Sequence, residues 1–419
     1  MTTHVQRVPR LTDRDVDDAI RADQPMIATD MLRSWAASSL WSFDFLKEQY
    51  GSDVVSLSDG RFQTLAELPL GHCLDFFSRV DLGDTHRLLG ATPYIQDWLL
   101  LDQHPELYEH IEVPGWFRNW ERSLMKLLRP GRPYHDIVAL AGPAGATTFL
   151  HRDRFRTHAW LAQIVGRKKW TLFPPDQYAL LFRDPEPGAQ AAVNIDDPDE
   201  DRFPHFGRAT PIEVVLHPGE MILVPAGWLH QVTSLDPSIS VTGNWVNAAN
   251  FSLFVRDAVA LQVEQARERR QPAPPALVDA LTRLRPSLGD GVLSTAPGRV
   301  VLKGAAGDCA LQVSGTADAT SWTLRNYHHG RRYTSFLVQP RTDLDRLGLD
   351  DDGPAAARAL QAFSSRGEFR VVVGFSAANL VLFGHPTGDI AQQWSAILGA
   401  LRRLAEACRP VSSEPAVGR

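Results

Sequence analysis

The sequence predicts a mainly β fold, a sandwich or jelly roll with flanking helices, followed by a smaller C-terminal region of mixed strands and helices. Between residues 136 and 246, short strand-like runs alternate with glycine and proline turns, which is typical of such folds. The segments on either side carry the apolar spacing of helices. A chain of 419 residues also exceeds what one compact core usually holds, so we expect two domains.

The N-terminal part is expected to be helical and mixed. "RLTDRDVDDAI", which starts at Arg10, offers Thr12 and Asp13 as N-caps, and "WSFDFLKEQYG" reads as a short helix that ends at Gly51. Asp59-Gly60 marks a hairpin turn. The apolar segment that opens at Tyr94 is expected to pack on the core.

The β region is predicted from turn signals. "AWLAQIVGRKKWTLFPPDQ" reads as two strands joined at Gly166-Arg167, and "HPGEMILVPAGWLHQVTS" and "SISVTGNWVN" read as further strands connected at Asp236-Pro237. A helix is expected from Phe251 until "RRQPAPP", which breaks it. Beyond residue 300, strands such as "RVVLKG" and "CALQVSG" are mixed with helices, the last from Asp389 to Cys408.

Composition narrows the function classes. A formal net charge of -6 gives no reason to expect nucleic acid or an anionic membrane as the main partner. The three cysteines lie far apart and form no C-x-x-C, so neither a disulfide framework nor a thiolate metal site is indicated. The start of the sequence lacks the apolar stretch of a signal peptide, and no run is long enough to cross a bilayer. We therefore expect a cytoplasmic protein.

The strongest chemical signal is His151-Arg152-Asp153, the only H-x-D in the chain. Residues two apart in a strand face the same side, so His151 and Asp153 can bind one ion together. His230, at the end of "PGEMILVPAGWLH", supplies a third ligand from another strand. Two histidines and one carboxylate on one face leave coordination positions open, an arrangement suited to Fe(II) oxygenases rather than to zinc or magnesium.

The open positions suggest a cosubstrate. 2-Oxoglutarate would chelate the iron at its keto acid end, and its distal carboxylate would then need a cation and hydrogen-bond donors. Lys168 is the best candidate cation, and Thr148 and Tyr94 are candidate donors. In an ideal strand Thr148, three residues before His151, faces the opposite side, so a bulge or turn must intervene. Thr147 is a rival for this role, Lys168 is alternatively a solvated hairpin lysine, and Tyr94 is alternatively a core aromatic.

At these residues the chain resembles the JmjC/cupin-like Fe(II)- and 2-oxoglutarate-dependent oxygenases, especially the asparaginyl hydroxylase of the hypoxia pathway and its bacterial relatives. The resemblance covers a little over half the chain, from about Asp23 to about Val246, through "TTFLHRD", "AQIVGRKKWTLFPPDQ", "DDPDEDRFPHF", "HPGEMILVPAGWLH" and "GNW". It implies a double-stranded β-helix, with iron held by His151, Asp153 and His230. It also implies that Lys168, Thr148 and Tyr94 bind 2-oxoglutarate, that O2 is the oxidant, and that Asn244 lies near the iron-bound end.

The order of these segments predicts a domain plan: an oxygenase domain at 1–260, a helical linker at 261–299, an α+β domain at 300–410 and a disordered tail at 411–419. The chain departs from the family pattern after Asp153, where two extra residues precede Gln163 and "RFRTHA" replaces a usual asparagine. Thr157 or His158 is a candidate for that asparagine's role, which otherwise goes unfilled.

The function expected from these features is hydroxylation of an amino-acid side chain in a peptide or protein. Alternatives with the same mechanism are a small-molecule or natural-product hydroxylase and an N-methyl demethylase, although no aromatic cage for methyl-lysine is evident. A cupin metal protein that does not use 2-oxoglutarate, and a binding module without activity, are the alternatives from other classes. The last predicted helix could form a homodimer seam or cover its own domain.

Overall fold

The computed structural model describes residues 4–62, 64–79, 92–120, 137–182, 192–270, 275–288, 291–296, 299–306, 309–315, 322–328, 331–338, 370–372 and 382–384. The chain divides into two compact units. The first comprises residues 1–64, 69–79 and 92–262, and the second comprises residues 65–68, 80–91 and 263–419. This division rests on compactness alone, so the predicted domain plan remains a prediction.

The N-terminal part of the first unit contains short helices and strands. They are β1 (Gln6–Val8), α1 (Asp13–Ala22), β2 (Met26–Ala28), α2 (Ala37–Leu40), α3 (Phe43–Tyr50), β3 (Val54–Ser58), α4 (Leu70–Arg79), β5 (Tyr94–Trp98) and α6 (Leu100–Gln103), with 3-10 turns at Met31–Ser34 and Pro105–His110. β4 (Thr64–Pro69) is assigned largely to the second unit.

Both predicted N-terminal helices are confirmed, with Thr12 as the N-cap of α1 and with α3 ending just before Gly51. The Thr12 hydroxyl accepts a hydrogen bond from the Asp15 amide, and the Asp15 carboxylate accepts one from the Thr12 amide, which is a complete capping box. Ser42 caps α3 by accepting from the Phe45 amide, and Gly51 follows the last residue of that helix.

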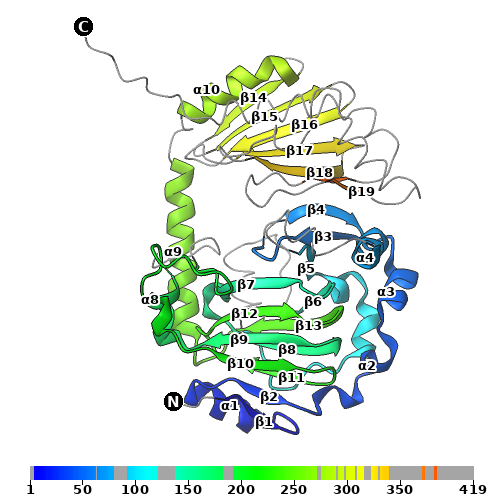
Figure 1. Cartoon of the computed structure of the whole chain (residues 1–419), viewed down its shortest axis with the longest axis vertical. Coiled ribbons are helices and arrows are strands. Elements are labelled where there is room, and N and C mark those ends of the chain that lie inside the picture. Colours follow the sequence, from blue (N-terminus) through cyan, green and yellow to red (C-terminus); the bar gives the residue numbers. More distant parts are fainter. Residues whose placement is uncertain are drawn as a thin grey trace. The chain divides into compact units, whose positions relative to one another are not determined.

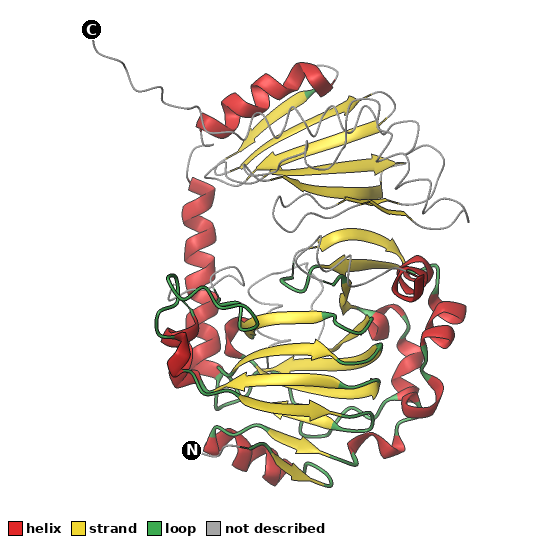
Figure 2. Cartoon of the chain, in the orientation of Figure 1, coloured by secondary structure: helices red, strands yellow, loops and turns green. Residues whose placement is uncertain are grey.

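Eight strands build the centre of the first unit, as Figure 1 shows. They are β6 (Ile137–Gly142), β7 (Thr147–Arg152), β8 (His158–Val165), β9 (Lys168–Phe173), β10 (Ile212–Leu216), β11 (Met221–Val224), β12 (Leu229–Ser234) and β13 (Ser238–Trp245). One sheet runs β10-β9-β12-β7, and the larger sheet contains the order β2-β11-β8-β13-β6-β5-β3. Except for β9 and β10, consecutive strands alternate between the sheets, which confirms the double-stranded β-helix. The helices lie outside these sheets (Figure 2).

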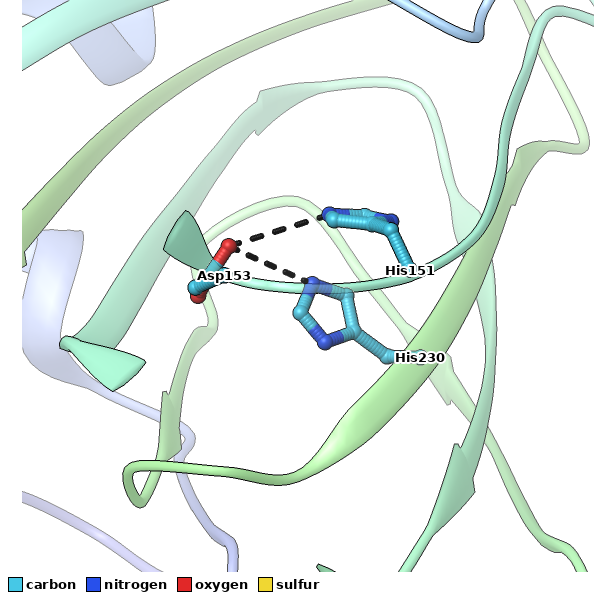
Figure 3. Close-up of side chains that lie close together, drawn as sticks. All are labelled: His151, Asp153 and His230. Carbon is cyan, nitrogen blue, oxygen red and sulfur yellow. Dashed lines mark ion pairs between the residues drawn. The ribbon is translucent and has the colours of Figure 1, made fainter. Parts of the chain in front are cut away.

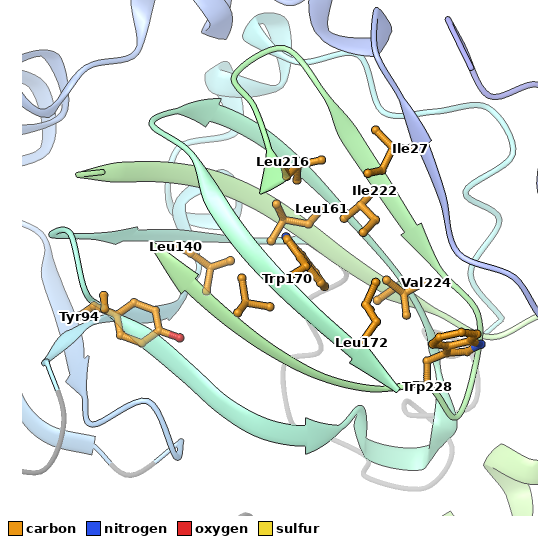
Figure 4. Close-up of a cluster of buried hydrophobic side chains, with 13 residues drawn as sticks. Ile27, Tyr94, Leu140, Leu161, Trp170, Leu172, Leu216, Ile222, Val224 and Trp228 are labelled. Atoms are coloured by element: carbon orange, nitrogen blue, oxygen red, sulfur yellow. The ribbon is translucent and has the colours of Figure 1, made fainter. Parts of the chain in front are cut away.

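The core of this unit lies between the two sheets (Figure 4). Trp170 and Leu172 of β9 face Leu161 of β8 and Ile222 of β11, and all four side chains are buried. The residues two apart on each strand point to the same side, as alternation requires. Burial of each large apolar side chain stabilises the fold by about 1.5–3 kcal/mol. This core fixes the faces of β7, β9 and β12 that carry the candidate site residues.

The turns predicted at one end of the sheets are confirmed. Gly166 joins β8 to β9 at φ +71°, where a Cβ would lie 2.2 Å from the Pro237 carbonyl oxygen, so only glycine fits. The next residue, Arg167, makes two side-chain bonds to Asp236, at 2.7 and 3.1 Å, and thereby joins this turn to the β12–β13 connection.

After the β-helix, α9 (Phe251–Arg270) confirms the helix expected at Phe251. Shorter elements of the first unit are 3-10 turns at Arg154–Arg156, Pro175–Gln177 and Phe206–Arg208 and helix α8 (Tyr178–Leu181). None of the helices in the described ranges is long and apolar enough to cross a membrane.

The second unit contains an antiparallel five-stranded sheet in sequential order. Its strands are β14 (Val292–Ala296), β15 (Arg299–Ala306), β16 (Cys309–Gly315), β17 (Trp322–His328) and β18 (Arg331–Val338). Helix α10 (Pro275–Leu284), a 3-10 turn at Arg285–Leu288 and the strand pair β19 (Arg370–Val372) and β20 (Leu382–Gly384) also belong to it. The predicted strands "RVVLKG" and "CALQVSG" are confirmed. The predicted helix 389–408 and tail 411–419 lie outside the described residues.

Candidate metal centre

Two neighbouring strands bring the predicted ligands together. His151 lies near the end of β7 and pairs directly with His230 of β12, and Asp153 follows β7 by one residue. The Nε2 atoms of His151 and His230 lie 3.7 and 3.9 Å from Asp153 Oδ1 (Figure 3). One donor atom from each residue falls within 4.8 Å of the others, so the three side chains could hold a single ion.

A hydrogen bond fixes the metal-binding tautomer of His151, and burial keeps both imidazoles neutral. The Nδ1 atom of His151 lies 2.8 Å from the Phe149 carbonyl, which can only accept, so Nδ1 carries the proton and Nε2 keeps its lone pair. His230 stacks on Trp170 with ring centroids 5.5 Å apart. Burial lowers the pKa of both histidines to about 4. Both rings are therefore neutral near pH 7, as metal coordination requires.

The third ligand, Asp153, is a carboxylate in a buried setting. Burial raises its pKa, while His151 and a hydrogen bond from Asn244 act in the opposite direction. The Asn244 amide also donates to the Thr157 hydroxyl at 2.9 Å, which fixes the amide beside the carboxylate. A buried carboxylate beside two neutral imidazoles needs a cation, and an ion held by two nitrogens and one oxygen on one face retains open positions.

A bulge resolves the question of where Thr148 points. His230 pairs with His151, but Val232, two residues along β12, pairs with Thr148, three residues back along β7. Between these pairs one residue of β12 faces two residues of β7, and the extra residue in β7 reverses the alternation. Thr148 therefore shares the inward face with His151. Thr147, the rival candidate, instead bonds to Thr233 at 3.0 Å and to the Gly145 carbonyl at 3.2 Å.

Lys168 is a lysine whose side chain is buried in the described part of the chain. It begins β9 on the same face as Trp170 and Leu172, and only 5% of it is exposed. Its ammonium makes no hydrogen bond or ion pair with any residue in the described ranges, and burial lowers its pKa to about 7. Its neighbour Lys169 faces outward and pairs with Glu213 at 2.6 Å. A buried ammonium without a protein partner is suited to an anionic ligand.

Tyr94 lies next to Thr148. Its hydroxyl is hydrogen-bonded to the Thr148 hydroxyl, and its ring is buried in the inter-sheet core. Burial raises the pKa of this phenol, so it stays a neutral donor. Gly142 of β6 makes room for Tyr94, because a Cβ there would lie 2.6 Å from the Tyr94 Cβ. Tyr94 is thus both a core aromatic and a member of the inward-facing polar group.

In the segment after Asp153, the two candidates for the role of the family's asparagine, Thr157 and His158, make different contacts. Thr157 accepts the Asn244 bond and so lies beside the ligand carboxylate. His158 points elsewhere: its Nδ1 accepts from the Ala226 amide at 2.9 Å, and its ring lies against Trp245. Sequence reasoning also missed Phe62, an exposed aromatic whose ring centroid lies 5.1 Å from that of His151 in an edge-to-face arrangement.

The sequence profile of the cupin-like domain family matches residues 14–251, more than half of the chain. The chain belongs to this family. Its relatives include the 2-oxoglutarate and iron-dependent oxygenase JMJD4 of Gallus gallus, which is 25% identical over 65% of this chain and 68% of its own length. The lysine-specific demethylase JMJ21 of Arabidopsis thaliana is 32% identical over 56% of this chain, and the arginine-specific demethylase JMJ20 of that plant is 26% identical over 55%.

This cupin-like chain spans 24% of the JMJ21 demethylase and 54% of the JMJ20 demethylase. The similarity to JmjC oxygenases and demethylases confirms the family expected from the sequence, and the narrower likeness to the asparaginyl hydroxylase remains a prediction. The donor set of the cupin-like domain fits an iron ion, and the buried Lys168 fits an acidic cosubstrate.

Proposed function

We propose that this chain is an Fe(II)- and 2-oxoglutarate-dependent oxygenase that hydroxylates an amino-acid side chain in a peptide or protein. The observation that carries the proposal is the shared inward face of one sheet. It presents the three metal donors at one end and, at the other, a buried ammonium that has no partner among the described residues.

The spacing along the strands supports a bridging cosubstrate. On β12, His230 pairs with Leu172 of β9, and Ser234 pairs with Lys168. Four residues of strand separate the two ends by about 13 Å at roughly 3.3 Å per residue. A short dicarboxylate and the extended lysine side chain together can fill that space, with the keto acid end toward the triad.

The protein groups have separate tasks in this proposal. His151, Asp153 and His230 hold the iron, which when bound supplies the redox chemistry that couples 2-oxoglutarate and O2 to C–H hydroxylation. Lys168 and the hydroxyls of Thr148 and Tyr94 bind the distal carboxylate with charge-assisted hydrogen bonds. The apolar core around Trp170 excludes water from this carboxylate. Asn244 orients Asp153 from the opposite sheet.

A turnover assay tests the proposal. The purified chain is incubated with Fe(II), ascorbate and 2-oxoglutarate in air, and succinate release is measured with and without a library of peptides, proteins and metabolites. We expect slow succinate release by the unaltered chain, none by His230→Ala, and stimulation by a protein or peptide that gains one oxygen atom. Stimulation by a metabolite alone would instead indicate a small-molecule hydroxylase. Release that persists in His230→Ala, or none from any mixture, would refute the proposal.

Demethylation is the second candidate, because relatives of this chain carry the names of lysine- and arginine-specific demethylases. The same centre would hydroxylate an N-methyl group, which then leaves as formaldehyde. Mass spectrometry of the stimulating substrate separates the two outcomes: a retained oxygen supports hydroxylation, and loss of a methyl group with formaldehyde release supports demethylation.

A cytoplasmic location stays a proposal from the sequence, and a homodimer stays one of the two roles left open for the last predicted helix. Light scattering of the purified full chain measures its mass directly, with twice the 46.5 kDa chain mass expected for a dimer.

A further inference from the structure

The backbone just beyond Asp153 adopts an unfavourable conformation. Phe155 and Arg156 have φ values of +60° and +49°, although neither is glycine or asparagine. Two consecutive bulky residues in the left-handed region are rare, and such backbone persists only where surrounding contacts hold it. This is also the segment in which the sequence departs from the family pattern.

The contacts that hold this segment come mainly from helix α9 and the residue before it. Arg156 makes two bonds to Asp257, from Nε to Oδ2 and from an Nη to Oδ1, both at 2.9 Å. The Asn250 amide donates to the Arg156 carbonyl at 3.0 Å. The ring of Phe155 packs against fully buried Phe254, with centroids 5.4 Å apart.

The ion pair between Arg156 and Asp257 fixes the relative position of the two side chains more than it contributes surface charge. The side chains of Arg156 and Asp257 are 21% and 13% exposed, so water screens the pair only partly. A two-pronged arginine–carboxylate contact fixes both the distance and the angle between the groups. The adjacent Arg256, 58% exposed, touches the same carboxylate with a single contact at 3.3 Å, which fixes much less.

The held segment is joined directly to the metal ligand. The Arg156 amide donates to the Asp153 carbonyl at 3.1 Å, and this bond closes a backbone turn between Asp153 and Arg156. On the other side, Thr157 accepts the bond from Asn244, whose amide also contacts the Asp153 carboxylate. Movement of Arg156 would therefore displace both the backbone and the hydrogen-bond partner of Asp153.

We infer that Arg156 and Asp257 are positioning residues for the metal centre: their ion pair fastens the strained turn after β7 to α9 and so holds the Asp153 carboxylate toward His151 and His230. This inference rests on the proposed metal centre. An ion pair that merely anchored α9 would change stability and leave metal affinity unaltered. If this ion pair, called the clamp below, positions Asp153, its loss changes metal affinity itself.

Metal titration tests the clamp without any need for turnover. Mn(II) binding to the purified full chain is followed by the loss of the free-ion electron paramagnetic resonance signal. The variants are Arg156→Ala, Asp257→Asn and the two combined. Arg256→Ala is the matched control on the same carboxylate, and Arg167→Ala removes another two-pronged Arg–Asp pair, at the end of the sheets away from the triad.

We expect each clamp variant to weaken Mn(II) binding about tenfold or more, the range seen when groups that orient metal ligands are lost. The combined variant should bind Mn(II) with about the same affinity as the single variant that binds it less tightly, because both residues act through one contact. The two controls should bind as the unaltered chain does. Asp257→Asn preserves side-chain size, so it keeps the test available if Arg156→Ala does not fold.

Unchanged Mn(II) affinity in folded clamp variants would overturn the inference and leave the proposed function standing. A similar loss in Arg167→Ala would also overturn it, because the effect would then be general destabilisation. If the unaltered chain binds no Mn(II), the metal centre itself is wrong, and the proposed function and the clamp fall together.

Discussion

Replacing Lys168 with methionine should make the protein more stable and weaken its binding of 2-oxoglutarate. Methionine keeps the length and the apolar stem of lysine but removes the ammonium. Burial lowers the pKa of Lys168 from its ordinary value of 10.5 to about 7. At about 1.4 kcal/mol per pH unit, keeping the ammonium charged in the ligand-free fold costs about 5 kcal/mol below pH 7. The methionine variant should recover a few kcal/mol of this.

The sign of the pH effect follows from proton binding. Between pH 7 and 10.5 the unfolded chain holds the Lys168 proton and the folded chain has released it, so the unaltered protein gains stability as the pH rises. Lys168→Met removes that gain. Urea unfolding at pH 7 and pH 9.5 should therefore show a smaller pH difference in the variant than in the unaltered chain.

Although Lys168→Met should raise stability, it should lower the affinity for 2-oxoglutarate. Loss of one partner from a buried ion pair costs about 3–5 kcal/mol, which corresponds to a factor of roughly 10² to 10³ or more in 2-oxoglutarate affinity. Calorimetry with Mn(II) in place of iron measures this without turnover. Lys169→Met is the control, because the Lys169 side chain is 42% exposed and pairs with Glu213 at the surface. A Lys168→Met protein that binds 2-oxoglutarate normally, or is less stable than the control, would refute the reasoning.

Three further outcomes are expected. The metal-free chain should lose stability as the pH falls from 6.5 toward 4. Burial lowers the pKa of His151, His158 and His230 to about 4, so the unfolded chain takes up their protons at a higher pH than the folded chain does. A melting temperature that does not change with pH over this range would contradict the prediction. Asn244→Ala should weaken Mn(II) binding about tenfold through the freed carboxylate, and unchanged affinity in the same titration would exclude that role. Gly142→Ala should displace Tyr94 and leave Mn(II) affinity unchanged. It should lower 2-oxoglutarate affinity about tenfold, roughly the contribution of one charged hydrogen bond. Calorimetry that finds both dissociation constants unaltered would show that Tyr94 does not bind 2-oxoglutarate.

The metal donors and the strands that carry them could be predicted because their signal is local. The spacing of His151 and Asp153 needs only the alternation of a strand, and glycine turns mark where strands end. The N-cap at Thr12 is equally local and was one of the two caps predicted from residue types; the reciprocal bond from Asp15 was added by the structure. Lys168 was identified by position, but its burial without a partner emerged only from the packing of the two sheets.

Other features of the site depend on contacts that no local pattern encodes. The bulge that turns Thr148 inward arises from the pairing of β7 with β12, about eighty residues apart. The clamp joins Arg156 to Asp257 across a hundred and one residues, through a backbone conformation that these residue types disfavour. Thr157 and His158 were indistinguishable in sequence, and only the position of Asn244 on β13 separates them.

The central claim is that three side chains hold one ion and leave room on it for 2-oxoglutarate. Absorption spectroscopy under anaerobic conditions tests this most directly: Fe(II) and 2-oxoglutarate are added to the purified chain and to His151→Ala. A visible charge-transfer band that appears only with both additions, saturates at one iron per chain and is missing in the variant is the predicted result. No band in the unaltered chain, or the same band in His151→Ala, would contradict the account.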